Sequence, residues 1–88
     1  MTDDDIIAAL RRMLVNDLFV ELTEDQIGLD DGLQNIVGLD SIGFAELLVL
    51  CERKFNVQVA TEDYVPENFS TVRRLTNLIM RLQKKEAA

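Results

Sequence analysis

The chain has 88 residues and a formal net charge of −7, and it contains neither histidine nor tryptophan. A chain this short buries only about 60–65% of the surface that it exposes when unfolded, which leaves little room for both a core and a substrate-sized cleft. Without histidine it also lacks the side chain most often used for acid–base catalysis and for metal binding. We therefore expect no enzyme, no catalytic residue and no metal ligand.

Charge is distributed unevenly along the chain. Residues 1–72 hold 15 acidic and 4 basic residues, a net charge of −11, whereas residues 73–88 hold 1 acidic and 5 basic residues, a net charge of +4. The acidic part would repel nucleic acid and favours partners with basic patches. The basic end complements the dipole at the C-terminus of a helix. A protein partner is therefore expected rather than a nucleic acid.

The sequence predicts neither a sorting signal nor a membrane span. It opens with Met1 and Thr2 followed by three aspartates, the opposite charge sign from a signal or transit peptide. No apolar run approaches the roughly 20 residues that cross a bilayer. The single cysteine, Cys51, cannot form an internal disulfide and is expected to be a small buried side chain. These features predict a cytoplasmic protein without membrane association, and its small size and net charge favour a monomer.

The first predicted element is an amphipathic helix over residues 3–19, followed by a long loop over residues 20–39. Thr2 and Asp5 resemble a capping box at the start of the helix. The apolar residues of the helix recur at the spacing of one face: Ile6, Ile7, Leu10, Met13, Leu14 and Leu18. The loop contains many turn-forming residues, but its separated apolar residues can hold it against the helices. These are Leu22, Ile27, Leu29, Leu33, Ile36 and Val37.

A second helix is predicted over residues 41–55, with two apolar lines along it. The longer line has the spacing of a core face and consists of Phe44, Leu47, Leu48, Cys51 and Phe55. The shorter line consists of Ile42, Ala45 and Val49. Two lines indicate either a centrally buried helix or a helix with an exposed apolar face.

The rest of the chain predicts a brief extended stretch and two further helices. Residues 61–68 contain the only proline, Pro66, which limits a helix there to one or two turns. Ser70 is the predicted N-cap of the last helix. The expected fold is all-α: a four-helix bundle with a long loop between helices 1 and 2 and a short third helix. We expect residues 1–88 to form a single domain.

The most informative local motif is Gly38-Leu39-Asp40-Ser41-Ile42, where the loop becomes the second helix. It places a hydroxyl at a helix N-terminus, where unpaired N–H groups and the helix dipole suit a phosphate ester. Gly38 gives the backbone freedom to turn just before the helix. Taken alone, however, Asp40 and Ser41 favour a simple helix start, since aspartate and serine are preferred N-caps.

The wider sequence resembles the acyl carrier protein family. The run GLDSIGFAEL at residues 38–47 is similar to the phosphopantetheine attachment motif of that family. Other landmarks follow in the family's order: ERKF at residues 52–55, VQV at 57–59 and FSTV at 69–72. The resemblance covers nearly the whole chain and implies a freestanding carrier with the family's four-helix fold.

The resemblance implies a role for each residue of the motif. Ser41 would accept 4′-phosphopantetheine from coenzyme A through a Mg²⁺-dependent phosphopantetheinyl transferase, and Asp40 would belong to the motif which that transferase recognises. The thiol of the arm would hold acyl groups as thioesters. The implied docking residues are the apolar Ile42, Ala45 and Val49, with Glu46 and Glu52 as charged contacts. Core packing is the alternative for the three apolar residues.

The implied partners are acyl-loading, condensing and acyl-transfer enzymes of polyketide, fatty-acid-like or antibiotic biosynthesis. The sequence departs from the family at several positions. Ile42 replaces a leucine, and Gly43 replaces a residue that is often polar or acidic. Arg53 and Lys54 replace acidic residues, which makes the docking face less acidic and counts against service to a housekeeping fatty acid synthase.

Other functions were weighed against the acyl carrier. A peptidyl or aminoacyl carrier often has histidine where Asp40 stands, and a cofactor-free helical adaptor would tolerate Ser41→Ala. An EF-hand fails on register, because placing Gly32 or Gly38 at position 6 puts Ile27 or Leu33 where aspartate is needed. A metal-dependent enzyme would need its loop carboxylates to cluster, and the candidates are Asp30, Asp31 and Asp40.

Overall fold

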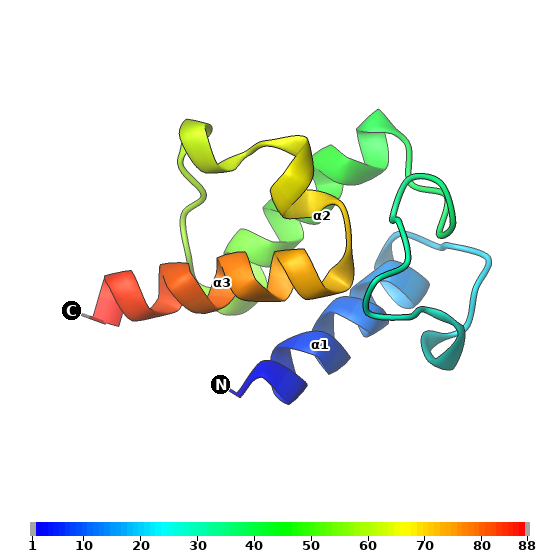
Figure 1. The fold of residues 1–88 in the computed structure, drawn as a ribbon, viewed down its shortest axis with the longest axis horizontal. Helices are drawn as coiled ribbons and strands as arrows, with labels where there is room; N and C mark the ends of the chain where they lie inside the picture. The colour runs from blue at the N-terminus through cyan, green and yellow to red at the C-terminus, as the bar shows by residue number, and fades with distance from the viewer. Residues whose placement is uncertain (1, 88) are drawn as a thin grey trace.

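The computed structural model describes residues 2–87, with side chains for residues 2–85. This part of the chain holds three α-helices and no strand: α1 (Asp3–Arg12), α2 (Ser41–Phe55) and α3 (Val72–Ala87) (Figure 1). The all-α prediction is confirmed. None of the helices described is both long and apolar enough to cross a membrane.

The four-helix count is not confirmed, because the expected short third helix is replaced by two 3₁₀ turns. These turns are Thr61–Asp63 and Pro66–Phe69. Between them the backbone is extended at Val65, with φ −121° and ψ 152°. A residue that precedes proline is disfavoured in the helical region, and proline itself cannot donate to the preceding turn. Pro66 therefore separates the segment into two single turns.

The first helix begins as predicted but ends differently. The capping box is present, with Asp5 N–H donating to Thr2 Oγ1 and Thr2 N–H donating to Asp5 Oδ2, both at 3.2 Å. After α1, residues Met13–Asp17 form a π-helical turn instead of continuing the α-helix. Leu18 N–H closes this wider turn on the Met13 carbonyl at 2.9 Å. The helix stops at Phe19, which adopts the left-handed conformation with φ 56°.

Phe19 is a strained and exposed residue, which leads to a stability prediction. Its side chain is 81% exposed, so it contributes little to packing. Left-handed backbone costs an ordinary residue about 1 kcal/mol, whereas asparagine tolerates it. Phe19→Asn is therefore expected to raise the free energy of unfolding by about 1 kcal/mol in urea titrations followed by circular dichroism. Ile36→Asn is the control, since it also removes an exposed apolar side chain but from a residue without positive φ. An equal gain in both variants would contradict the prediction.

The three helices pack around one core. α1 packs against α3, and α2 contacts both α3 and the Met13–Asp17 turn. In Figure 1, α3 ends at the left of the molecule and the long loop lies at the right. Many of the large, fully buried side chains come from the three helices and the Met13–Asp17 turn: Ile6, Leu10, Leu14, Leu47, Leu75, Leu78 and Ile79.

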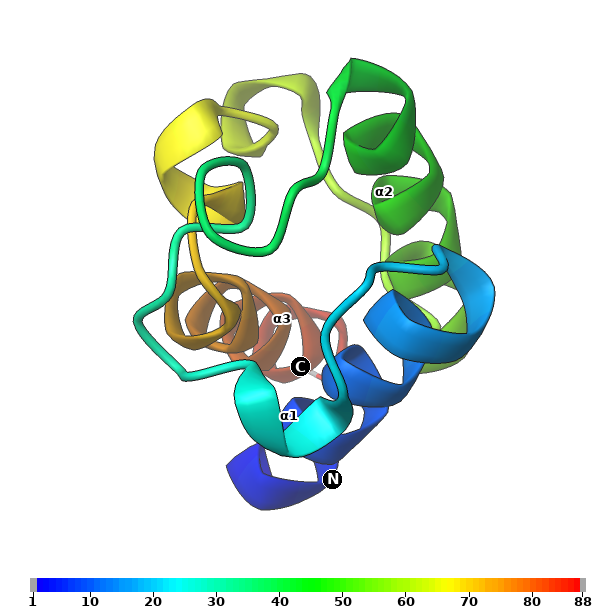
Figure 2. The ribbon, with the colours of Figure 1, turned by 90° about the vertical axis from the view of Figure 1, so that its right-hand side faces the viewer.

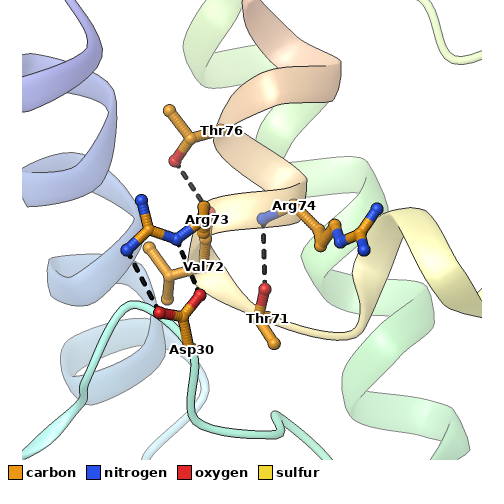
Figure 3. A network of polar contacts seen from close by, with 6 residues as sticks. All are labelled: Asp30, Thr71, Val72, Arg73, Arg74 and Thr76. Carbon is orange, nitrogen blue, oxygen red and sulfur yellow. Dashed lines mark hydrogen bonds and ion pairs between the residues drawn. The ribbon is translucent and has the colours of Figure 1, made fainter.

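The long loop is fixed to the bundle, as its apolar residues predicted. Ile27 and Leu33 are fully buried. Leu33 N–H donates to the Ser70 carbonyl at 2.9 Å, and the Arg73 guanidinium binds both oxygens of Asp30 at 2.7 and 3.1 Å (Figure 3). These hydrogen bonds lower the pKa of the Asp30 carboxyl. Figure 2 shows the loop passing across the end of the bundle towards the start of α2.

The N-cap of α3 lies one residue later than predicted. Thr71 Oγ1 accepts from Arg74 N–H at 3.1 Å, which is the capping hydrogen bond (Figure 3). Ser70, the predicted cap, instead donates its hydroxyl to the Glu67 carbonyl at 2.7 Å. It closes the preceding 3₁₀ turn with a helical backbone, so it cannot take the extended conformation that is typical of an N-cap.

Candidate functional site

The site predicted at the start of α2 is a helix N-terminus with an exposed hydroxyl. Asp40 is the N-cap, and its Oδ1 accepts from Gly43 N–H at 2.8 Å. Ser41 is the first residue of the helix and is exposed. Within residues 2–87, the backbone N–H groups of Ser41 and Ile42 have no acceptor. The Ser41 hydroxyl therefore lies at the positive end of the helix dipole, beside free N–H donors.

The loop delivers the chain to this position in a defined conformation. Gly38 has φ 95°, a value that favours glycine. The next residue, Leu39, is buried, and its N–H donates to the Leu33 carbonyl at 2.8 Å. A Cβ at Gly43 would lie 3.0 Å from Leu39 Cδ2 and 3.4 Å from Asp40 Oδ1. The departure from the family at Gly43 thus leaves room for both the buried leucine and the capping carboxylate.

Ser41 borders two hollows on the surface. The first, which we name the α2 hollow, has a volume of about 700 Å³ and is mostly apolar. Its walls are formed by Asp17, Ser41, Ile42, Ala45, Glu46, Val49 and Leu50. The second, the Tyr64 hollow, has a volume of about 500 Å³ and lies among the loop at residues 32–35, Phe44 and the segment 64–70. A group attached to Ser41 can reach either hollow without crossing the core.

Four of the five predicted docking residues lie together in the α2 hollow. Ile42 is 70% exposed and Val49 47% exposed, and Ala45 and Glu46 are also exposed. Core packing, the alternative for the apolar line, is therefore contradicted for these side chains. The longer line of α2 instead faces the interior, as predicted from its spacing.

Glu52 lies elsewhere and has a structural contact. It is half-buried, and its Oε2 accepts from Val59 N–H at 2.9 Å. This hydrogen bond holds the extended segment that follows α2. Asp17 and Leu50 also line the α2 hollow but were not predicted. Leu50 follows Val49 on α2, whereas Asp17 comes there only because the Met13–Asp17 turn packs beside α2.

Cys51 is buried, as predicted, and is not a nucleophile. It is 1% exposed, and burial, with a smaller contribution from the Glu52 charge, raises the pKa of its thiol to about 12. The thiolate is the reactive form of cysteine, so this thiol is inert at physiological pH. It cannot itself hold cargo as a thioester.

The loop carboxylates that could have formed a metal site are each engaged separately. Asp30 pairs with Arg73, Asp31 Oδ2 accepts from Gly28 N–H at 2.8 Å, and Asp40 caps α2. No group of three or more potential metal ligands occurs among the residues described. The remote alternative of a metal-dependent acidic enzyme has no support in this arrangement.

A comparison with known families identifies the class of protein. The model of the phosphopantetheine attachment site family matches residues 7–79. The chain belongs to this family. The match covers the second part of α1, the loop, α2 and the first half of α3, and so includes Ser41 and both hollows.

Family membership establishes the coarse function. Phosphopantetheine attachment domains carry the prosthetic group covalently and are carriers without catalytic activity of their own. They meet a phosphopantetheinyl transferase and biosynthetic enzymes. The expectations of a 4′-phosphopantetheine cofactor and of a non-enzymatic role are therefore confirmed.

The surroundings of Ser41 fit the prosthetic group. An exposed hydroxyl can form the phosphate ester, and the free N–H groups of Ser41 and Ile42 can face its charged oxygens. Glu46, which follows Ser41 on α2, is the acidic residue of this helix that lines the α2 hollow. When bound, the group supplies the thiol that forms thioesters, which the buried Cys51 cannot do.

Proposed function

We propose that the chain is an acyl carrier protein in which Ser41 carries 4′-phosphopantetheine and residues 1–88 act as one carrier domain. It holds acyl intermediates as thioesters and presents them to loading, condensing and acyl-transfer enzymes of polyketide or fatty-acid-like synthesis in the cytoplasm. The observation that carries the proposal is the exposed Ser41 hydroxyl at the N-terminus of α2, between two hollows.

The chain supplies the nucleophilic oxygen but not its activation. No histidine is present, and the neighbouring Asp40 carboxylate already accepts the Gly43 N–H. Removal of the Ser41 proton therefore falls to the transferase. The role of this chain is to present the hydroxyl on a rigid helix start, with the positive end of the dipole ready for the incoming phosphate.

Asp40 combines a capping role with a proposed recognition role, and two substitutions separate them. Asp40→Ala removes the cap and is expected to lower the free energy of unfolding by about 1 kcal/mol. Asp40→Asn keeps an equally good cap and should leave the unfolding midpoint unchanged. If the transferase recognises the carboxylate, Asp40→Asn nevertheless slows loading, as measured by the rate of mass gain. Loading of Asp40→Asn at the wild-type rate would confine Asp40 to capping.

The proposal also states the chemical class of the cargo, which is an acyl group rather than an aminoacyl group. It is supported by aspartate rather than histidine before Ser41 and by the largely apolar surfaces of the two hollows. The test is to isolate the protein from its producing cells under thioester-preserving conditions and to release the arm in the mass spectrometer. Acyl masses are expected on the released arm. Aminoacyl masses would show that the chain is a peptidyl carrier instead, with the attachment role of Ser41 unchanged.

A further inference from the structure

A third hollow continues the α2 hollow along the seam between α1 and α2. It has a volume of about 270 Å³ and is lined by α1 residues, among them Arg12, and by Arg53 and Lys54 at the end of α2. Asp17 and Leu50 line both hollows, so the two adjoin. We name the combined feature the α1–α2 furrow.

The charge along the furrow changes sign. Glu46 lines the part that begins at Ser41, Asp17 lies where the two parts meet, and the far part carries Arg12, Arg53 and Lys54. From Glu46 to Arg53 the helix rises about 10 Å, which separates the acidic part of the furrow from its basic part. Exposed Ile42 and Val49 lie in the part nearer Ser41.

None of these charges forms an ion pair with another described side chain. Among the side chains of residues 2–85, the ion pairs are Asp30–Arg73 and Glu67–Arg74, both away from the furrow. The three cations of the far part are all exposed. They are therefore available to a partner at short range, where solvent screening is weakest once the surfaces meet.

Helix dipoles explain only part of this pattern. Arg53 and Lys54 lie in the last turn of α2, where cations are favourable. The dipole accounts less well for Arg12, because the helical backbone continues through the Met13–Asp17 turn and Arg12 is therefore not at its C-terminal end. The exposed Ile42 and Val49 have no such explanation either. Side chains from two helices, about 40 residues apart in sequence, are brought together only by the fold.

We propose that the α1–α2 furrow docks a partner protein whose contacting strip is bipolar. The strip is basic opposite Glu46 and Asp17, apolar opposite Ile42 and Val49, and acidic opposite the three cations of the far part. A uniformly basic strip would meet like charge at the far end, and this repulsion selects against such partners. The proposal rests on the proposed function, since that function brings partner enzymes to Ser41.

The test uses three synthetic helical peptides with the same length and the same leucine face. One has lysines in one half and glutamates in the other, one has only lysines, and one has only glutamates. Binding to the full chain is measured by fluorescence anisotropy at low salt, and amide chemical shifts locate the contact. The bipolar peptide is expected to bind at least about threefold tighter than either uniform peptide, with shifts along the furrow.

Two double variants with the same change in net charge separate position from charge. Arg53→Glu with Lys54→Glu should make the all-lysine peptide the tightest binder, because Arg12 is then the one cation left in the far part and the furrow as a whole becomes acidic. Arg81→Glu with Lys84→Glu alters exposed cations on α3 that do not line the furrow, and should keep the bipolar preference. If the α2 variant fails to fold by circular dichroism, Arg12→Glu from the other wall serves instead and should weaken the bipolar preference.

Several results would overturn the proposal. They are equal binding of the bipolar and all-lysine peptides, an equal response of the two double variants, chemical shifts outside the furrow, and no binding of any peptide. The assay does not use the prosthetic arm, so it is independent of loading at Ser41. If the bipolar peptide binds best but Ser41 is not loaded, the docking proposal holds and the attachment role is rejected. If Ser41 is loaded but the bipolar peptide has no preference, the attachment role holds and the docking proposal is rejected.

Discussion

Ser41→Ala is expected to abolish attachment of phosphopantetheine while leaving the protein folded. After incubation with coenzyme A, Mg²⁺ and a broad-specificity transferase, intact-protein mass spectrometry should show one added group on the wild type and none on the variant. The loss is complete because no other atom can replace the missing oxygen. The fold survives because Ser41 is exposed and Asp40 provides the cap, so the stability change should stay within about 0.5 kcal/mol.

The chain provides a matched control for this experiment. Ser70 is its only other serine, and it lines the Tyr64 hollow together with Ser41. Ser70→Ala should therefore load like the wild type. Residual loading of Ser41→Ala would show that the group attaches elsewhere. An unmodified wild type, next to a reference carrier modified in the same tube, would contradict Ser41 as the attachment residue.

Leu33→Ala is expected to cause a large loss of stability, although Leu33 lies in a loop. The side chain is fully buried, and truncating a buried leucine costs about 2–4 kcal/mol because of lost burial and the cavity left behind. A chain of 88 residues has a total stability of about 4–13 kcal/mol, so the loss is a large fraction. Urea titration followed by circular dichroism should show a much lower midpoint.

Ile36→Ala is the control for this prediction, since it removes an apolar side chain from the same loop. Ile36 is 60% exposed, and its truncation should change the free energy of unfolding by less than about 0.5 kcal/mol. The Leu33 carbonyl accepts from Leu39 N–H, two residues before Ser41, so loading should also slow in Leu33→Ala. Similar midpoints for the two variants would mean that the loop carries no part of the core.

The elements governed by short-range signals were predictable from sequence. The second helix was expected over residues 41–55 and is found there, because Asp40 caps its start and a regular apolar line runs along it. The capping box at Thr2 and the exposed hydroxyl at Ser41 follow from equally local chemistry. Capping, apolar periodicity and backbone preference each act within a few residues, so they can be recognised in the sequence without knowledge of the fold.

Predictions failed where several local preferences compete. The segment with Pro66 was expected to be a short helix and forms two 3₁₀ turns. The cap expected at Ser70 is at Thr71, since both residues are good caps and the preceding turn uses the first. The π-helical turn at Met13–Asp17 has no sequence signal that we can identify.

By itself, the sequence determined the class of fold, the helix that presents Ser41 and the resemblance that led to the carrier function. Only the tertiary structure decided that Ile42 and Val49 are exposed while Glu52 holds a neighbouring segment, and that Arg12 and Asp17 lie beside α2. The physical reason is the distance along the chain over which the deciding contacts act. A helix forms from contacts three or four residues apart, whereas the face that it leaves exposed depends on how all the helices share one core.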